Sequence, residues 1–234
     1  MSLQLSYGLA VLLVGQLPTI KADGFGPSIQ QETILATVHI INDKKKTFGA
    51  GVLLNPTGAF TYVLTAAHMV EGADSVDVLV FDAKSYPKAV KIYRSQSITR
   101  ARDRQPDLAI VKLIGYKGES KGLKVCPLKG IPREKSFAVL ASACGENLAP
   151  TLRQLTVKDT VRAIKPNEDR TGKYFRTAEK SVKGQSGGPL VDAKGQLLGI
   201  CSGANGDHGY FCHIEEIHAF LNAHDLKVLL KTEP

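Results

Sequence analysis

The stretch KGQSGGPLVD, from Lys183 to Asp192, places one serine among glycines, ahead of a proline and a short apolar run. The glycines allow a tight turn, and the apolar run after Pro189 is typical of a strand. A serine hydroxyl is a weak nucleophile until a base lies within hydrogen-bond distance and a third group holds that base. A nucleophilic role for Ser186 therefore requires a histidine and a carboxylate elsewhere in the chain.

Two upstream segments carry such residues. His68 lies in TAAHMV, just after a β-branched apolar run, and Asp107 opens the segment DLAIVKL, ahead of a second apolar run. Taken alone, the histidine could be a packed or surface residue and the aspartate could be a turn former. The order His, Asp, Ser argues against an α/β-hydrolase, in which the nucleophile comes first and a helix follows it.

Short β-branched runs recur along the chain and are separated by turn clusters such as NDKKK and NPTG. The runs predicted as strands are 33–41, 49–54, 61–66, 75–81, 89–94, 108–113, 136–141, 189–192, 196–202 and 210–214. Because no helical pattern separates them, they favour antiparallel barrels or sandwiches over βαβ units. At the C-terminal end, EEIHAFLNAHDLKVLL has apolar residues at helical spacing, which predicts a helix over 215–230.

Together, TAAH, DLAIVKL and GQSGGPLVD resemble the chymotrypsin/trypsin family of serine peptidases, which uses its triad in this chain order. The resemblance covers roughly Thr33 to His224. It implies a mostly β fold with two antiparallel six-stranded barrels, the first over about 33–115 and the second over about 123–214, followed by the C-terminal α-helix.

The resemblance also implies a site and a reaction. His68 would be the base, Asp107 would hold its imidazole, and Ser186 would attack a peptide carbonyl to form an acyl-enzyme. The N–H groups of Gly184 and Ser186 match the donors of the family's oxyanion hole. The expected substrate is a protein or peptide, and no metal or cofactor is expected.

Substrate-binding residues follow from the same resemblance. Ser202, Gly203 and Ala204 match the edge segment that pairs with the substrate backbone. Counted back from Ser186 without gaps, Lys180 falls where trypsins keep the aspartate at the base of the primary pocket. A buried lysine there would favour acidic substrate side chains, whereas an exposed one would not.

Two residues depart from pancreatic trypsins. Gln185 stands where those enzymes carry the aspartate that captures the new amino terminus after zymogen cleavage, so this kind of activation is not expected. Met69 follows the histidine, so the disulfide that many trypsins place there is absent. The chain is closer in character to bacterial HtrA/DegP-type peptidases, which need no such cleavage, but it is not expected to hold the PDZ domain that usually follows them.

The cysteines Cys126, Cys144, Cys201 and Cys212 are even in number and permit disulfides in an oxidising compartment. None has the CxxC spacing of a zinc ribbon or a thioredoxin-like site. The family resemblance places Cys201 and Cys212 on neighbouring antiparallel strands, which predicts that they lie close enough for a disulfide. A Cys126–Cys144 pair stays open.

The N-terminal segment has the pattern of a secretory leader. An apolar run from Leu9 to Leu17 precedes a cleavage position after Ala22, which predicts a signal peptide over 1–22 and a secreted or periplasmic location. A first core strand is the alternative interpretation. The run is too short to span a bilayer. The polar residues 23–32 are predicted as an N-terminal arm of a peptidase domain over 33–234.

Composition adds a weaker clue about partners. With 43% hydrophobic and 22% charged residues, the 234-residue chain can bury a core. The formal net charge of +8 could attract an anionic polymer. A solvated basic surface is the simpler interpretation, because the run from Lys44 to Lys46 lies in a predicted hairpin turn and the basic segment 88–104 lacks regular aromatic interleaving.

Two function classes therefore fit the sequence. The first is a serine endopeptidase, and the second is a catalytically silent protein of the same fold that binds or scaffolds a partner. Oligomeric state and physiological substrate leave no pattern in the sequence.

Overall fold

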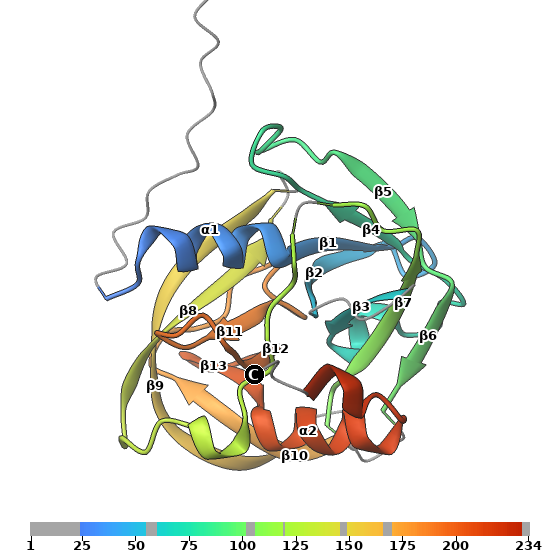
Figure 1. Ribbon diagram of the computed structural model, residues 1–234. Helices are drawn as coiled ribbons and strands as arrows, with labels where there is room; N and C mark the ends of the chain where they lie inside the picture. Colours follow the sequence, from blue (N-terminus) through green and yellow to red (C-terminus); the bar gives the residue numbers. More distant parts are fainter. Residues whose placement is uncertain are drawn as a thin grey trace, which may run out of the picture.

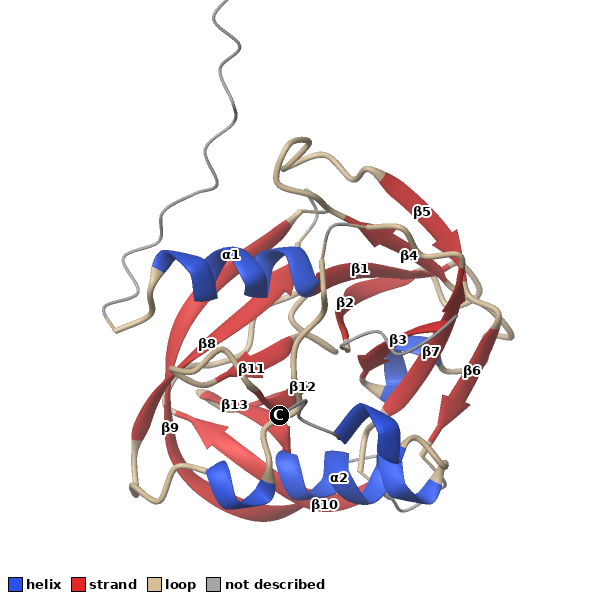
Figure 2. Cartoon of the chain, viewed as in Figure 1, coloured by secondary structure: helices blue, strands red, loops and turns tan. Residues whose placement is uncertain are grey.

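The computed structural model describes residues 24–54, 60–101, 106–118, 120–145, 149–165 and 170–230. The expected signal peptide, 1–22, lies outside these residues. Within them, two β units lie side by side, and helices contribute little beyond one near each end of the described chain (Figure 1, Figure 2). The mostly β, antiparallel architecture expected from the sequence is confirmed.

The first unit is an antiparallel sheet. Its strands are β1 (Thr37–Asn42), β2 (Thr47–Leu53), β3 (Phe60–Thr65), β4 (Asp77–Val80), β5 (Lys91–Arg94), β6 (Ser97–Arg100) and β7 (Ala109–Ile114). They form a seven-stranded sheet in the order β5-β4-β1-β2-β3-β7-β6. In the described residues, this first unit is therefore a seven-stranded sheet and not the closed six-stranded barrel that was expected. The extra strand, β6, pairs with β7 and comes from the basic segment, where charged residues hide the alternation of a strand.

The second unit is a closed six-stranded barrel in the order β10-β13-β12-β11-β8-β9. Its strands are β8 (Phe137–Cys144), β9 (Pro150–Lys165), β10 (Arg170–Thr177), β11 (Pro189–Val191), β12 (Leu197–Asn205) and β13 (His208–His213). The expected second barrel is thus present. Its long β9–β10 hairpin was not predicted, because charged residues interrupt its apolar pattern.

One continuous core joins the two units. It contains Val52 and Leu64 from the first sheet together with Leu140 and Val191 from the barrel. The connecting segment pairs with both, through the bridges Leu54–Leu123 and Val125–Leu197, and the 3-10 turn η2 (Leu128–Gly130) follows it. The units are therefore held face to face along β2, β8 and β12.

The expected N-terminal arm instead folds from Pro27 onward as the helix α1 (Pro27–Ala36), which packs against β8 and β9. The first strand consequently begins at Thr37 and not at Thr33. Thr33 and Ile34 are β-branched and favour a strand locally, but burial of Ile34 and Ala36 in the shared core outweighs that preference. Proline at the first turn suits a helix start, where its missing N–H is not needed.

The C-terminal helix is shorter than expected. α2 (Ile214–Ala223) ends before Asp225, whose φ of 59° is left-handed, and the 3-10 turn η3 (Lys227–Leu230) follows. The N–H of Leu226 donates to the Leu221 carbonyl at 2.9 Å and closes the helix end. The predicted single helix over 215–230 is therefore two elements.

Cys201 and Cys212 lie on the neighbouring antiparallel strands β12 and β13, as expected, but the predicted disulfide between them is wrong. Cys201 lies opposite Phe211, and Cys212 lies opposite Ile200, so the strands are offset by one residue from the expected pairing. Because side chains alternate across a strand, a one-residue offset puts the two sulfurs on opposite faces of the sheet. All four cysteines are buried thiols, and none forms a disulfide in the described structure.

A first prediction concerns these four buried thiols. Native protein should react with an aromatic disulfide reagent at none of its four cysteines within minutes, and at all four after unfolding in guanidinium. Burial hinders the reagent and raises the pKa of Cys126 to about 11 and that of Cys144 further, so thiolate is scarce. Finding only two reactive thiols in unfolded, unreduced protein would show a disulfide and contradict this assignment.

A second prediction concerns His213, which caps α2 by accepting the Glu215 N–H at its Nδ1, 3.2 Å away. Burial, helped by the charge of Lys173, lowers the pKa of His213 from 6.5 to about 4. The unfolded chain therefore binds more protons than the native one between these values, so stability is lost as pH falls from 6.5 toward 4. At about 1.4 kcal/mol per pKa unit, the loss reaches about 3 kcal/mol.

Urea unfolding between pH 4 and 7 measures this loss. His213→Asn keeps a capping side chain but has no proton to gain, so its free energy of unfolding should fall less over the same range. Identical pH dependence in both proteins would exclude His213 as the titrating group.

Candidate active site

His68 lies on the 3-10 turn η1 (Ala67–Val70), directly after β3. Met69 and Val70 are buried and fix the turn, while the His68 side chain keeps 24% of its surface exposed. The Thr65 hydroxyl, at the end of β3, donates to the Ala50 carbonyl of β2 at 2.8 Å. The imidazole is therefore presented at a fixed edge of the first sheet, as the sequence predicted.

Asp107 immediately precedes β7 and is completely buried. β7 pairs with β3 so that Ala109 lies opposite Thr65, which brings the residues just before β7 beside those just after β3. Asp107 Oδ2 lies 2.7 Å from His68 Nδ1, and Oδ1 accepts the His68 backbone N–H at 3.0 Å. Both carboxylate oxygens thus contact the same residue, which fixes the imidazole orientation.

The second unit supplies a further donor to this carboxylate. The Ser202 hydroxyl, which is buried, donates to Asp107 Oδ2 at 2.6 Å. The pairing of β12 with β13 shifts between Cys201 and Gly203, so Ser202 falls at a bulge. A bulge re-aims a side chain. Ser202 is expected from the sequence in the edge that pairs with substrate backbone; its side chain in addition contacts Asp107, a role that no local sequence pattern marks.

Cys212 and Tyr174 also lie near Asp107. Cys212 Sγ lies 3.7 Å from the Asp107 carbonyl oxygen. Burial, with the nearby charges of Cys212 and Asp107 adding to it, raises the pKa of the Tyr174 phenol, which therefore stays protonated. A buried carboxylate is tolerated when hydrogen bonds satisfy it, and here the donors are on His68 and Ser202.

Ser186 lies half-buried in the turn before β11. Its carbonyl accepts the Ala50 N–H of β2 at 2.8 Å. A Cβ at the neighbouring Gly49 would lie 2.7 Å from that carbonyl and 2.8 Å from the Met69 side chain, so the serine turn and the histidine turn meet the same part of β2.

Backbone conformation and close packing explain why glycine occupies two positions of the serine turn. Gly184 has a φ of 82°, and a Cβ there would overlap the Cys144 carbonyl of β8. Gly187 has a φ of 81°, and a Cβ there would overlap the Ala50 carbonyl. Within the described residues, the N–H groups of Gly184 and Ser186 donate to no backbone carbonyl.

The other expected substrate-binding residues lie in two places, on β12 and on the exposed segment before the serine turn. Gly203 and Ala204 lie on β12 beyond Ile200, the last residue that pairs with β11, so their outer edge has no strand partner in the described part of the chain. Lys180 is exposed, and its carbonyl accepts a hydrogen bond from Arg153 Nη1 at 3.1 Å. The buried lysine considered from the sequence is therefore not observed.

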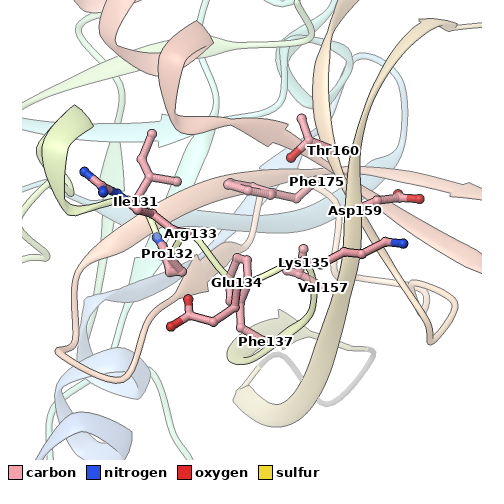
Figure 3. Close-up of a pocket in the computed structure, with 10 residues that line it drawn as sticks. All are labelled: Ile131, Pro132, Arg133, Glu134, Lys135, Phe137, Val157, Asp159, Thr160 and Phe175. Atoms are coloured by element: carbon pink, nitrogen blue, oxygen red, sulfur yellow. The ribbon is translucent and has the colours of Figure 1, made fainter.

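A cavity of about 280 Å³ opens elsewhere, at the start of β8 (Figure 3). Its lining residues are Ile131, Pro132, Arg133, Glu134, Lys135, Phe137, Val157, Asp159, Thr160 and Phe175. Asp159 is paired with Arg176, and the charged side chains of the 133–135 loop are exposed. The cavity shares no residue with the His68–Asp107 cluster, and no buried polar group among its lining residues would orient a ligand.

The basic surface is partly neutralised by acidic side chains. Lys45 lies 3.6 Å from Glu71, and Arg94 lies 2.8 Å from Asp77 and 3.7 Å from Asp43. Part of the formal charge on this side is therefore already paired.

No three His, Cys, Asp or Glu residues of the described chain are grouped so as to hold a metal ion. None of its described helices combines the length and apolar character that crossing a membrane requires.

The Ser202–Asp107 contact gives a third prediction. Ser202→Ala should lower the free energy of unfolding in urea by about 1.5–3 kcal/mol, because it removes a hydrogen bond to a charged, buried group. Ser142→Ala is the matched control, since the Ser142 hydroxyl is buried and has no hydrogen-bond partner within the described residues. Equal destabilisation by the two substitutions would show that the contact with Asp107 contributes nothing specific.

The chain is similar to several curated serine proteases. The Do-like serine protease HtrA of Lactobacillus helveticus is 26% identical over 163 residues, which are 69% of this chain and 37% of that protein. The serine endoprotease DegS of Escherichia coli K12 is 27% identical over 157 residues, which are 66% of this chain and 39% of that protein. The chain thus spans about two fifths of the length of these curated relatives.

Solved structures share the fold. The Rv3671c protease of M. tuberculosis, in its inactive form, superposes with a TM-score of 0.67 at 21% identity and covers 83% of this chain and 91% of that one. The resemblance to HtrA-type peptidases expected from the sequence is confirmed by the named relatives. Residues 49–200 match the sequence family described as the trypsin-like peptidase domain, and the chain belongs to that family.

Proposed function

We propose that this chain is a serine endopeptidase in which Ser186, His68 and Asp107 form the catalytic triad. The observation that carries the proposal is the 2.7 Å contact between His68 Nδ1 and the buried Asp107 carboxylate, in a chain of the trypsin-like peptidase family. A histidine held in this way has a defined tautomer. Nδ1–H donates to Asp107, which leaves Nε2 free of a proton to act as a base.

The proposed reaction uses these groups in sequence. His68 Nε2 takes the proton of the Ser186 hydroxyl as Oγ attacks the carbonyl carbon of a peptide bond. The resulting oxyanion accepts hydrogen bonds from the N–H groups of Gly184 and Ser186. His68 then gives the proton to the leaving amine as the C–N bond breaks. Water, deprotonated by His68, hydrolyses the acyl-enzyme and restores the serine.

The substrate would bind as an added strand. The outer edge of β12 around Gly203 and Ala204 would pair with an extended peptide, although the Gly203 carbonyl already accepts the Ser181 hydroxyl at 2.8 Å. Such pairing favours protein substrates over small esters. Because Lys180 is exposed, it gives no reason to expect a preference for acidic substrate side chains. A secreted or periplasmic location, as expected from residues 1–22, belongs to the proposal as well.

The alternative is a silent binding protein of the same fold. The exposed edge of His68 and the two N–H groups directed to no backbone carbonyl favour catalysis over this alternative, because a purely binding surface has no need of either.

A fluorophosphonate probe tests the proposal and gives the fourth prediction. Wild-type protein should be labelled stoichiometrically on Ser186 and should hydrolyse fluorescent casein. Ser186→Ala should lose labelling and at least about 10³-fold in turnover, since residual catalysis then rests on binding and the oxyanion donors alone. Ser142→Ala, which changes a buried serine whose hydroxyl has no hydrogen-bond partner among the described residues, should retain both activities.

Folding must be checked in parallel by far-UV circular dichroism. If folded wild type is neither labelled nor active on casein, the endopeptidase proposal fails and the silent binding protein takes its place.

A further inference from the structure

The turn that carries the two oxyanion donors is closed by an unusual pair of hydrogen bonds. Gln185 donates its backbone N–H to the Val182 carbonyl at 3.1 Å. In return, the side-chain oxygen Oε1 of Gln185 accepts the Val182 backbone N–H at 3.0 Å. The same two residues are therefore joined twice, once through the main chain and once through the glutamine amide.

This double link surrounds Gly184, whose own carbonyl accepts the Cys144 N–H of β8 at 2.9 Å. With the carbonyl fixed to β8 and the turn closed at Val182 and Gln185, the peptide groups between them have little freedom to rotate. The carbonyl of Gln185 is fixed in turn by the Gly188 N–H at 2.8 Å. The orientation of the Gly184 and Ser186 N–H groups is thus set by hydrogen bonds on either side of them.

The glutamine amide has no other polar contact that would explain its burial. Its side chain is inaccessible to solvent, and Nε2 has no hydrogen-bond partner among the described residues. A buried amide donor without a partner is unfavourable. The link from Oε1 to Val182 is consequently the one polar interaction that holds this side chain in place within the described structure.

We infer that Gln185 is a positioning residue that keeps the Gly184 and Ser186 N–H groups turned toward the reacting carbonyl. It acts through a neutral amide at a position where pancreatic trypsins use a charged carboxylate. The closed turn stands on the hydrogen bonds alone, while its effect on catalysis rests on the proposed peptidase function.

Two substitutions of similar size separate the acceptor from the packing. Gln185→Glu retains a side-chain oxygen at the same reach, and burial favours its protonated form, whose carbonyl still accepts the Val182 N–H. Gln185→Met fills the same volume without an acceptor. Gln185→Leu serves as a second apolar variant if the methionine protein does not fold.

Residue-resolved amide hydrogen exchange, measured by NMR, tests whether the turn stays closed and does not depend on catalytic activity. The Val182 amide should exchange at least about tenfold faster in Gln185→Met than in wild type and should return to within about threefold in Gln185→Glu, because only the methionine lacks the acceptor. The Ala50 amide, which bonds the Ser186 carbonyl, is the internal control and should stay protected in all proteins. Equal Val182 exchange in every variant would overturn the inference.

The kinetics of fluorescent casein hydrolysis test whether the closed turn affects catalysis. In Gln185→Met, kcat should fall by about 10- to 100-fold with KM nearly unchanged, since loss of one oxyanion donor reduces kcat by about 10²–10³-fold and a loosened donor by less. Gln185→Glu should restore kcat. Faster Val182 exchange with unchanged kcat would show that the turn does not position the donors. If wild type is inactive, the peptidase proposal fails, and the exchange comparison alone decides whether the amide holds the turn.

Discussion

The close approach between β2 and the serine turn is the constraint on which the site depends. The Ala50 N–H reaches the Ser186 carbonyl at 2.8 Å only because Gly49 and Gly187 have no Cβ, which would overlap backbone at this point. β2 belongs to the first sheet and the serine turn to the barrel, so this contact fixes the distance between the units (Figure 1). The candidate nucleophile and the candidate base can share one cleft only if that distance holds.

Burial of Asp107 couples the same interface to stability. A carboxylate that leaves water without partners is strongly unfavourable, so its donors decide whether it can stay ionised. His68 supplies donors from the first sheet, and Ser202 supplies one from the barrel. The charge is therefore fully satisfied only when both units are assembled. The same contacts that would orient the imidazole for catalysis also favour the assembled state, and this explains why the shared core and the site occupy one interface.

Sequence reasoning found the residues with strong local patterns and missed those set by distant contacts. His68 and Asp107 were identified because His68 follows one apolar strand and Asp107 precedes another, and the structure brings the two side chains together. α1 was missed because its β-branched residues favour a strand until Ile34 and Ala36 are buried in the core. The Cys201–Cys212 prediction failed by one residue of register, which depends on a bulge at Ser202 that no local pattern announces. The role of Ser202 was hidden for the same reason.

A neutral amide at Gln185 changes how an oxyanion site of this kind can be held. An ion pair to a newly formed amino terminus depends on prior cleavage and on a group that titrates near pH 7.7–8.0. The amide of Gln185 has no titratable proton, and it bonds a residue only three positions away, so the turn can close as soon as the chain folds. The carbonyls of Ser186 and Gly184 bond to β2 and β8, and the backbone of Gly187 and Gly188 bonds to Cys201 of β12; the shared core already fixes these strands. The geometry of the turn is therefore set by these strands and by the link between Gln185 and Val182, which contains no titrating group.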